Sequence, residues 1–294
     1  MIKSIKSNLN QFIIGNDDKI ELSMAAIIAG GSILLEDQPG TGKTTFAKLI
    51  ANSLGLDFKR IQFTSDMLPS DINGFVKYIN NEPNFQKGPI FSNIILADEL
   101  NRGNPKCQSA FMEAMEEKSV TIDGSTHNLP QPFFVIATQN PTEQVGTYPL
   151  PESQLDRFMI SFSMNKLNHD QEKEILKQKN NNQNINSLNI DIQKTMAEVN
   201  QIECNDIVIS YIQSLTEQTK KIKFETILST RTLLYTVQIS KALAYLNEKK
   251  YVTFDEVQKT FPYILKHRIK NVDFGVDILG YIQKEIIEKV PVPR

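Results

Sequence analysis

The chain has 294 residues, with 32 Lys and Arg against 34 Asp and Glu, so its formal net charge is −2. This balance gives no support to a protein that coats nucleic acid or an anionic membrane through bulk charge. Hydrophobic residues make up 40% of the chain and charged residues 22%, which excludes a wholly disordered protein. The length suggests about two domains.

Cysteines and histidines are few and scattered: Cys107, Cys204, His127, His169 and His267. This pattern argues against a disulfide scaffold and against a zinc site. The first ten residues lack the apolar core of a signal peptide, and the longest nearly apolar run, residues 25–35, is too short to span a bilayer. We therefore expect a cytoplasmic protein without a membrane segment.

The first half of the chain alternates short apolar strands with helical patterns. Strands are predicted at residues 32–36, 59–63, 94–98, 133–138 and 159–162. Such alternation predicts a mainly parallel sheet with helices on both faces. After about residue 167 the strand signals stop and helical periodicity takes over, interrupted by an Asn-rich connection at 180–189. We predict an α/β domain over residues 1–164 and a smaller all-α domain over 165–294.

A phosphate-binding loop is predicted where the first strand meets the first long helical pattern. The segment EDQPGTGKTT at 36–45 follows the pattern G-x-x-x-x-G-K-[ST], except that Asp37 replaces the first glycine. Backbone N–H groups and the positive end of a helix dipole form an anion cradle in such a loop. The residues expected to bind phosphate are Pro39, Gly40, Thr41, Gly42, Lys43, Thr44 and Thr45. The alternative is a Gly-rich turn followed by an exposed lysine.

The apolar strand at 94–98 ends in a carboxylate, Asp98, and a second carboxylate, Glu99, follows it directly. A Mg²⁺-dependent NTPase needs a carboxylate for the metal, and Asp98 is the candidate, together with the Thr44 hydroxyl. Hydrolysis also needs a base for the attacking water, which is the role expected of Glu99. A strand that simply ends in solvent is the alternative interpretation.

Several further segments match sequence motifs of one protein family: LADELNR at 96–102, QSAFMEAMEE at 108–117, VTIDG at 120–124, ATQNP at 137–141, GTYPLPESQLDRF at 146–158, RIQFT at 60–64 and LPSDI at 68–72. Together they resemble a MoxR-type AAA+ ATPase. The resemblance is most specific up to about residue 158 and is thinner beyond it. It implies a P-loop NTPase αβα sandwich followed by a small all-α lid domain.

The resemblance also implies further site residues. The sensor-one amide falls on Asn140, and the arginine finger, which acts on the ATP of a neighbouring subunit, falls on Arg157. Ser229-Thr230-Arg231 resembles the sensor-two motif, with Ser229 capping a helix and Arg231 reaching the γ-phosphate. Ile14 lies in the segment that contacts adenine in the family.

Two inserted features carry family meaning as well. Residues 71–88 resemble an insert within helix two, with bends at Gly74 and Gly88. Residues 119–130 resemble a hairpin that precedes sensor one, with Asp123-Gly124 as its turn.

The resemblance implies a homo-oligomeric ring, and we expect a hexamer. It also implies Mg²⁺-dependent hydrolysis of ATP to ADP and phosphate. It further implies chaperone-like remodelling of protein complexes with a von Willebrand factor A domain partner. Two other classes of function remain open at this stage. One is a nucleic-acid-dependent AAA+ motor, against which the charge balance argues. The other is a nucleotide-gated scaffold with little hydrolysis. Magnesium-chelatase-like action is a further related possibility.

Overall fold

The computed structural model describes residues 2–37, 40–140, 145–178, 190–270 and 276–293. The described chain divides into two compact units, each built from separate stretches of sequence. Unit 1 contains residues 1–20, 34–150 and 163–190, and unit 2 contains residues 21–33, 151–162 and 191–294. The predicted domain boundary at 164/165 therefore stays a prediction, and the Asn-rich stretch at 180–189 lies outside the described residues.

A five-stranded sheet has the spatial order β2-β5-β8-β1-β9, and the pairs β2–β5 and β5–β8 are parallel. Its strands are β1 (Ile33–Glu36), β2 (Phe58–Gln62), β5 (Ile94–Asp98), β8 (Phe134–Gln139) and β9 (Ile160–Phe162). All five strands were predicted to within one residue. Strand β5 is buried along its whole length, as its unbroken apolar run requires in a sheet covered on both faces.

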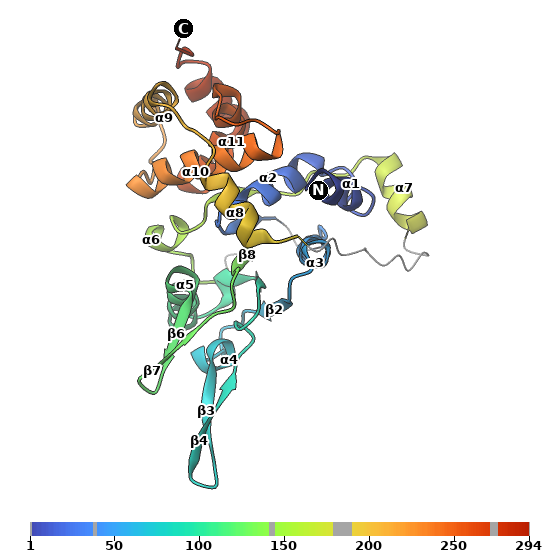
Figure 1. Cartoon of the computed structure of the whole chain (residues 1–294), viewed down its shortest axis with the longest axis vertical. Helices are drawn as coiled ribbons and strands as arrows, with labels where there is room; N and C mark the ends of the chain where they lie inside the picture. Colours follow the sequence, from blue (N-terminus) through green and yellow to red (C-terminus); the bar gives the residue numbers. More distant parts are fainter. Residues whose placement is uncertain (1, 38–39, 141–144, 179–189, 271–275, 294) are drawn as a thin grey trace. The chain divides into compact units, whose positions relative to one another are not determined.

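Helices and hairpins complete unit 1 (Figure 1). Its helices are α1 (Ile2–Asn10), α3 (Lys43–Leu54), α4 (Pro69–Asn73), η1 (Leu100–Arg102), α5 (Pro105–Glu117) and α7 (His169–Gln178). Its hairpins are β3 (Gly74–Ile79) with β4 (Glu82–Lys87), and β6 (Ser119–Ile122) with β7 (Ser125–Asn128). Helix α2 (Asp17–Ile28) begins in unit 1 and continues in unit 2.

Both predicted inserts are hairpins. The insert at 71–88 leaves α4 at Gly74 and forms the two-stranded arm β3–β4 (Figure 1). The turn of β6–β7 is Asp123-Gly124, and both residues have positive φ, 48° and 78°, as a tight hairpin turn requires. The two hairpins are in contact, because the Phe85 and His127 rings stack with their centroids 4.1 Å apart.

The described part of unit 2 is mainly helical and also contains β9 and most of α2. Its further helices are α6 (Glu152–Leu155), α8 (Ile192–Asn200), α9 (Asp206–Thr219), α10 (Thr230–Leu246), α11 (Phe254–Leu265), η2 (Lys266–Arg268), α12 (Ile278–Ile282) and η3 (Gln283–Ile287). Buried side chains such as Tyr211, Leu215 and Phe261 form one apolar cluster between these helices. Ser229 caps α10, which confirms the helix start predicted there, and Thr253 with Glu256 forms a capping box at α11.

Across the described ranges, we find no helix with the length and apolar character needed to cross a bilayer.

Gly74 is the point at which the β3–β4 arm leaves α4, and it has a φ of +92°. A Cβ at this position would come within 2.1 Å of the Gln86 backbone oxygen, so a side chain there forces backbone movement. We expect Gly74→Ala to lower the free energy of unfolding by roughly 2 kcal/mol or more. Chemical denaturation followed by circular dichroism measures this loss.

Gly124→Ala is the matched control, since Gly124 has a φ of +78° but open space where a Cβ would lie. Only the backbone cost, roughly 1 kcal/mol, is expected there. Equal losses in the two variants would show that the close approach at Gly74 is not a constraint.

Candidate active site

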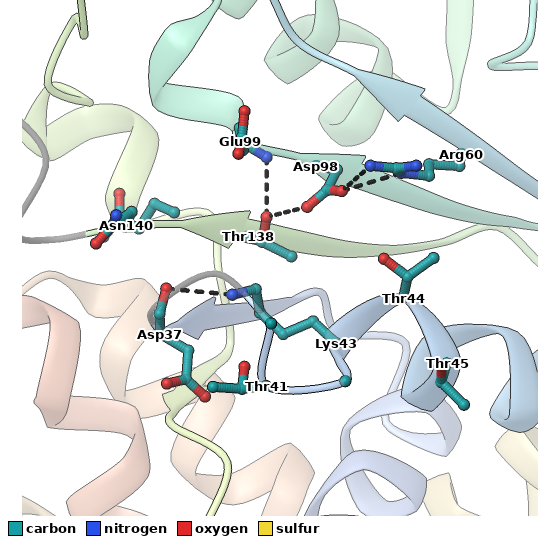
Figure 2. Close-up of a pocket in the computed structure, with 13 residues that line it drawn as sticks. Asp37, Thr41, Lys43, Thr44, Thr45, Arg60, Asp98, Glu99, Thr138 and Asn140 are labelled. Carbon is teal, nitrogen blue, oxygen red and sulfur yellow. Dashed lines mark hydrogen bonds and ion pairs between the residues drawn. The ribbon is translucent and has the colours of Figure 1, made fainter. Parts of the chain in front are cut away.

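The predicted phosphate loop connects β1 to the first turn of α3 (Figure 2). Gly40 and Gly42 have φ values of 85° and 84°, a region that costs a residue with a Cβ about 1 kcal/mol or more. Nothing lies within 4 Å of a Cβ built on either glycine, so both glycines face open space. Helix α3 begins at Lys43, and its positive end therefore points into that space.

The Lys43 amine lies close to the backbone at the start of the phosphate loop. Its Nζ donates a hydrogen bond to the Asp37 backbone oxygen at 3.2 Å. The Asp37 carboxylate, which replaces the expected glycine, accepts a hydrogen bond from the Met164 backbone N–H at 2.9 Å. The acidic side chain at this position therefore has a partner in its own unit.

Asp98 ends β5 and is held on both of its carboxylate oxygens. Oδ1 accepts a hydrogen bond of 2.6 Å from the Thr138 hydroxyl on β8. Oδ2 accepts two from Arg60 on β2, from Nε at 2.9 Å and from Nη2 at 2.6 Å. Because Asp98 is 7% exposed, these donors offset the cost of burying its charge.

Glu99 follows with a left-handed backbone, φ 53° and ψ 47°, which is unusual for a residue other than glycine. Its backbone N–H donates to the Thr138 hydroxyl at 2.8 Å, which helps to hold this conformation. The carboxylate accepts a hydrogen bond from Gln62 at 2.9 Å and lies 3.1 Å from Nε of Arg102. The left-handed turn places Glu99 directly after the buried strand β5 and beside Asp98.

These groups line one pocket of about 410 Å³. The predicted site residues that line it are Gly40, Thr41, Gly42, Lys43, Thr44, Thr45, Asp98, Glu99 and Asn140. Figure 2 shows Asp98, Glu99 and Thr138 across from the loop that carries Lys43. Two segments more than fifty residues apart in the printed sequence thus contribute to a single site within unit 1.

The remaining predicted site residues are not among the described residues that line the pocket. Ile14 is not among the residues that line the pocket, and Pro39 lies outside the described residues. Arg157 and Arg231 belong to unit 2, where Arg231 lies 3.7 Å from the Asp156 carboxylate.

Residues in and next to the pocket, to which the sequence assigned no role, bind the two acids. Arg60 and Thr138 bind Asp98, and Gln62, just outside the lining, binds Glu99. The signal that could have found them is strand register, since Gln62 on β2 is paired with Asp98 on the neighbouring strand β5. That register cannot be read from local sequence.

The donor set suits a magnesium ion. Mg²⁺ prefers oxygen ligands and is bound in nucleotide sites by one or two carboxylates or hydroxyls together with phosphate oxygens. The Thr44 hydroxyl and the Asp98 carboxylate line the same pocket. Among the described residues no group of three or more His, Cys, Asp or Glu could hold a metal without such a co-ligand.

Comparison with known proteins agrees with this geometry. The family model described as "ATPase family associated with various cellular activities" matches residues 32–160, and the AAA lid domain model matches residues 217–286. The chain is 40% identical to the uncharacterized protein YeaC of Bacillus subtilis over 97% of its own length and 93% of that protein. It is 41% identical to Chaperone MoxR1 of Mycobacterium tuberculosis, over 57% of this chain and 45% of that protein.

The chain belongs to the MoxR family of AAA+ ATPases. A solved structure of a candidate ATPase from Cytophaga hutchinsonii is similar to the MoxR-family fold described above, with a TM-score of 0.87 and 36% identity. The similarity covers 100% of this chain and 95% of that one. The predicted fold, a P-loop AAA+ α/β domain with a helical lid, is therefore confirmed.

Thr138 joins the two acids of this MoxR-family site, since one hydroxyl serves both Asp98 and the backbone of Glu99. We expect Thr138→Val to lower the free energy of unfolding by roughly 1–3 kcal/mol, because a buried carboxylate and a buried N–H each lose a partner. We also expect ATP turnover to fall, since Glu99 loses the bond that fixes its backbone. Phosphate release and thermal unfolding measure the two effects.

Thr236→Val is the control. Thr236 is equally buried, but its hydroxyl donates to the Thr232 carbonyl within α10. This variant is expected to turn over ATP at the wild-type rate. Unchanged turnover in Thr138→Val as well would contradict a role for the hydroxyl in the site.

Proposed function

We propose that this chain hydrolyses ATP to ADP and phosphate with Mg²⁺ bound in the pocket around Lys43, Asp98 and Glu99. The observation that carries the proposal is the convergence of an open phosphate loop and two strand-end carboxylates on one cavity. A loop of backbone donors with a lysine suits the β- and γ-phosphates. Two carboxylates on the opposite side suit the two other needs of hydrolysis, a metal ligand and a base.

Each residue takes a separate role in the proposed reaction. The loop from Pro39 to Thr45 binds the phosphates, and Lys43 neutralises their charge. Thr44 and Asp98 hold the Mg²⁺ ion, which when bound offsets negative charge on the phosphate oxygens. Glu99 orients and deprotonates the attacking water, and Asn140, which follows β8 beside β5, orients the water or contacts the γ-phosphate. Ile14 is the proposed contact for adenine.

Arg157 and Arg231 complete the proposed site from unit 2. Arg231 reaches the γ-phosphate within the same chain, and Arg157 acts on the ATP of a neighbouring subunit. An arginine supplied in this way typically gives ~10³–10⁵ in turnover. The proposal therefore requires a homo-oligomeric ring, a hexamer, in which a site is complete only beside a second copy. The two proposed domains, 1–164 and 165–294, would move relative to each other when ATP is hydrolysed.

The proposed outcome of the cycle is chaperone-like remodelling of partner complexes in the cytoplasm, together with a von Willebrand factor A domain protein. The name of the relative Chaperone MoxR1 supports the chaperone-like part of this proposal. The β3–β4 arm supports a role in partner binding, because Phe75 and Tyr78 on it are exposed.

Glu99→Gln tests the proposed base. The variant keeps the size and hydrogen-bonding reach of the side chain but removes its basicity. We expect it to bind ATP with near wild-type affinity and to lose ~10²–10⁴ in turnover. Equilibrium binding of a fluorescent ATP analogue and a phosphate-release assay measure the two quantities.

Glu113→Gln is the matched control, because Glu113 lies on the exposed face of α5. It should bind and hydrolyse ATP as the wild type does. Full turnover in Glu99→Gln would remove Glu99 from its proposed role.

A further inference from the structure

Unit 2 contains a buried polar cluster centred on Arg268, which has no solvent-exposed surface. A buried guanidinium carries five N–H donors and a full positive charge, so it persists only where acceptors surround it. Nε donates to the Asp156 carboxylate at 3.1 Å, and Nη1 donates to the Ile264 carbonyl at 2.5 Å. Nη2 donates to the backbone oxygens of Asp156 and Phe158, both at 2.9 Å.

The acceptors on one side of this cluster are three successive residues of the segment that contains Arg157. The Asp156 and Phe158 carbonyls accept from Arg268. The Arg157 carbonyl between them accepts from the Tyr235 hydroxyl of α10 at 3.1 Å. Three consecutive backbone oxygens outside a regular helix or strand are thus each held by a side chain from the helical part of unit 2.

His267 adds a further contact to the same segment. Its Nε2 lies 3.1 Å from the Phe158 oxygen and 2.9 Å from Nη1 of Arg268. Burial lowers the pKa of His267 well below its ordinary value, and the neighbouring Arg268 guanidinium lowers it further. The imidazole is therefore neutral near pH 7 and adds no second positive charge to the cluster.

The Asp156 carboxylate also connects this segment to the start of α10. Its Oδ2 accepts a hydrogen bond of 2.8 Å from Ser229, the residue that caps α10. The same oxygen lies 3.7 Å from Nη1 of Arg231 in the first turn of that helix. One carboxylate thus contacts a buried arginine, a helix cap and the arginine proposed to read the γ-phosphate.

We propose that Asp156 and Arg268 are a positioning pair, which fixes the backbone that carries Arg157 and aligns it with the helix start that carries Arg231. The inference rests on the proposed function, in which both of these arginines contact ATP. Neither Asp156 nor Arg268 contacts nucleotide in this proposal. They act by fixing the backbone positions of Arg157 and Arg231. A shift of about 1 Å in such a position can lower the rate ~10²-fold.

A purely structural salt bridge would not need this pattern of contacts. Lys249 and Glu256 form such a bridge in the same unit, with Nζ 2.6 Å from Oε1 and Glu256 only 2% exposed. The contacts of that pair stay within α11, its capping box and the adjoining loop. The contacts of Arg268 instead converge on residues 156–158, on both sides of Arg157.

The test compares kcat, KM for ATP and nucleotide affinity in the full-length chain. Asp156→Asn removes the charge that faces Arg268, and Asp156→Asn combined with Arg268→Met avoids an unpaired buried charge. Tyr235→Phe removes only the hydroxyl that holds the Arg157 carbonyl. We expect kcat to fall ~10²-fold in the first two variants. Tyr235→Phe should lose about fivefold, which corresponds to one neutral hydrogen bond.

Nucleotide affinity and KM should change by less than about threefold in all three variants, because the pocket in unit 1 is untouched. Hydrogen–deuterium exchange of the peptide around residues 152–160 should become faster. Should Asp156→Asn fail to fold, the double variant and Tyr235→Phe carry the test. Glu256→Gln is the control: it weakens an ion pair in the same unit whose acid is only 2% exposed, and it should keep the wild-type kcat.

The outcomes separate this inference from the proposed function. Wild-type protein that neither binds nor hydrolyses ATP overturns the proposed function itself. Hydrolysis by the wild type with a ~10³-fold loss in Arg157→Ala, but wild-type kcat in the double variant and in Tyr235→Phe, overturns only the positioning pair. An equal loss of kcat in Glu256→Gln also overturns it, since the effect would then be general destabilisation.

Discussion

The candidate site depends on the parallel alignment of neighbouring strands. Because β2, β5 and β8 run in the same direction, their carboxyl ends meet at one edge of the sheet. The polar residues that follow or end these strands therefore lie together, with Thr138 of β8 bonded to both Asp98 and the backbone of Glu99. The phosphate loop follows β1 at the same edge, and this common edge brings a lysine and two carboxylates to one pocket.

Buried charged groups have different surroundings in the two units. In unit 1 Asp98 is bonded to Thr138 and Arg60 but still lines an open pocket together with Lys43 and Glu99. In unit 2, Arg268 has no exposed surface, and its N–H groups donate to acceptors such as the Asp156 carboxylate and the Phe158 carbonyl. The first arrangement leaves acceptors available for a ligand. The second fixes a segment of backbone, and this difference is why we assign chemistry to one cluster and positioning to the other.

Local pattern was enough to predict the five strands and the Asp123-Gly124 turn, because each depends on residues close together in sequence. It also indicated that the loop at 36–45 and the acids at 98–99 belong to one site, and residues of both segments line one pocket. The insert at 71–88 was expected from the family resemblance alone, which did not indicate a hairpin. The roles of Arg60 and Gln62 could not be predicted in this way, since their partners lie on another strand and depend on its register. No local pattern indicated that Arg268 would be buried. Arginines are mostly exposed, and only the tertiary fold shows that this one is enclosed by the carbonyls of residues 156 and 158. The assignment of Ile14 to adenine has no counterpart in the pocket lining.

The proposed function requires that the loop around Lys43 and the acids at the end of β5 hold the same triphosphate. Calorimetric titration of ATP into the wild-type chain, with and without Mg²⁺, tests it most directly when it is repeated with Lys43→Ala and Asp98→Asn. We predict binding heat in the wild type that strengthens with Mg²⁺, little or no binding in Lys43→Ala, and binding that no longer responds to Mg²⁺ in Asp98→Asn. Equal ATP affinity in all three proteins, with the same response to Mg²⁺, would contradict the claim.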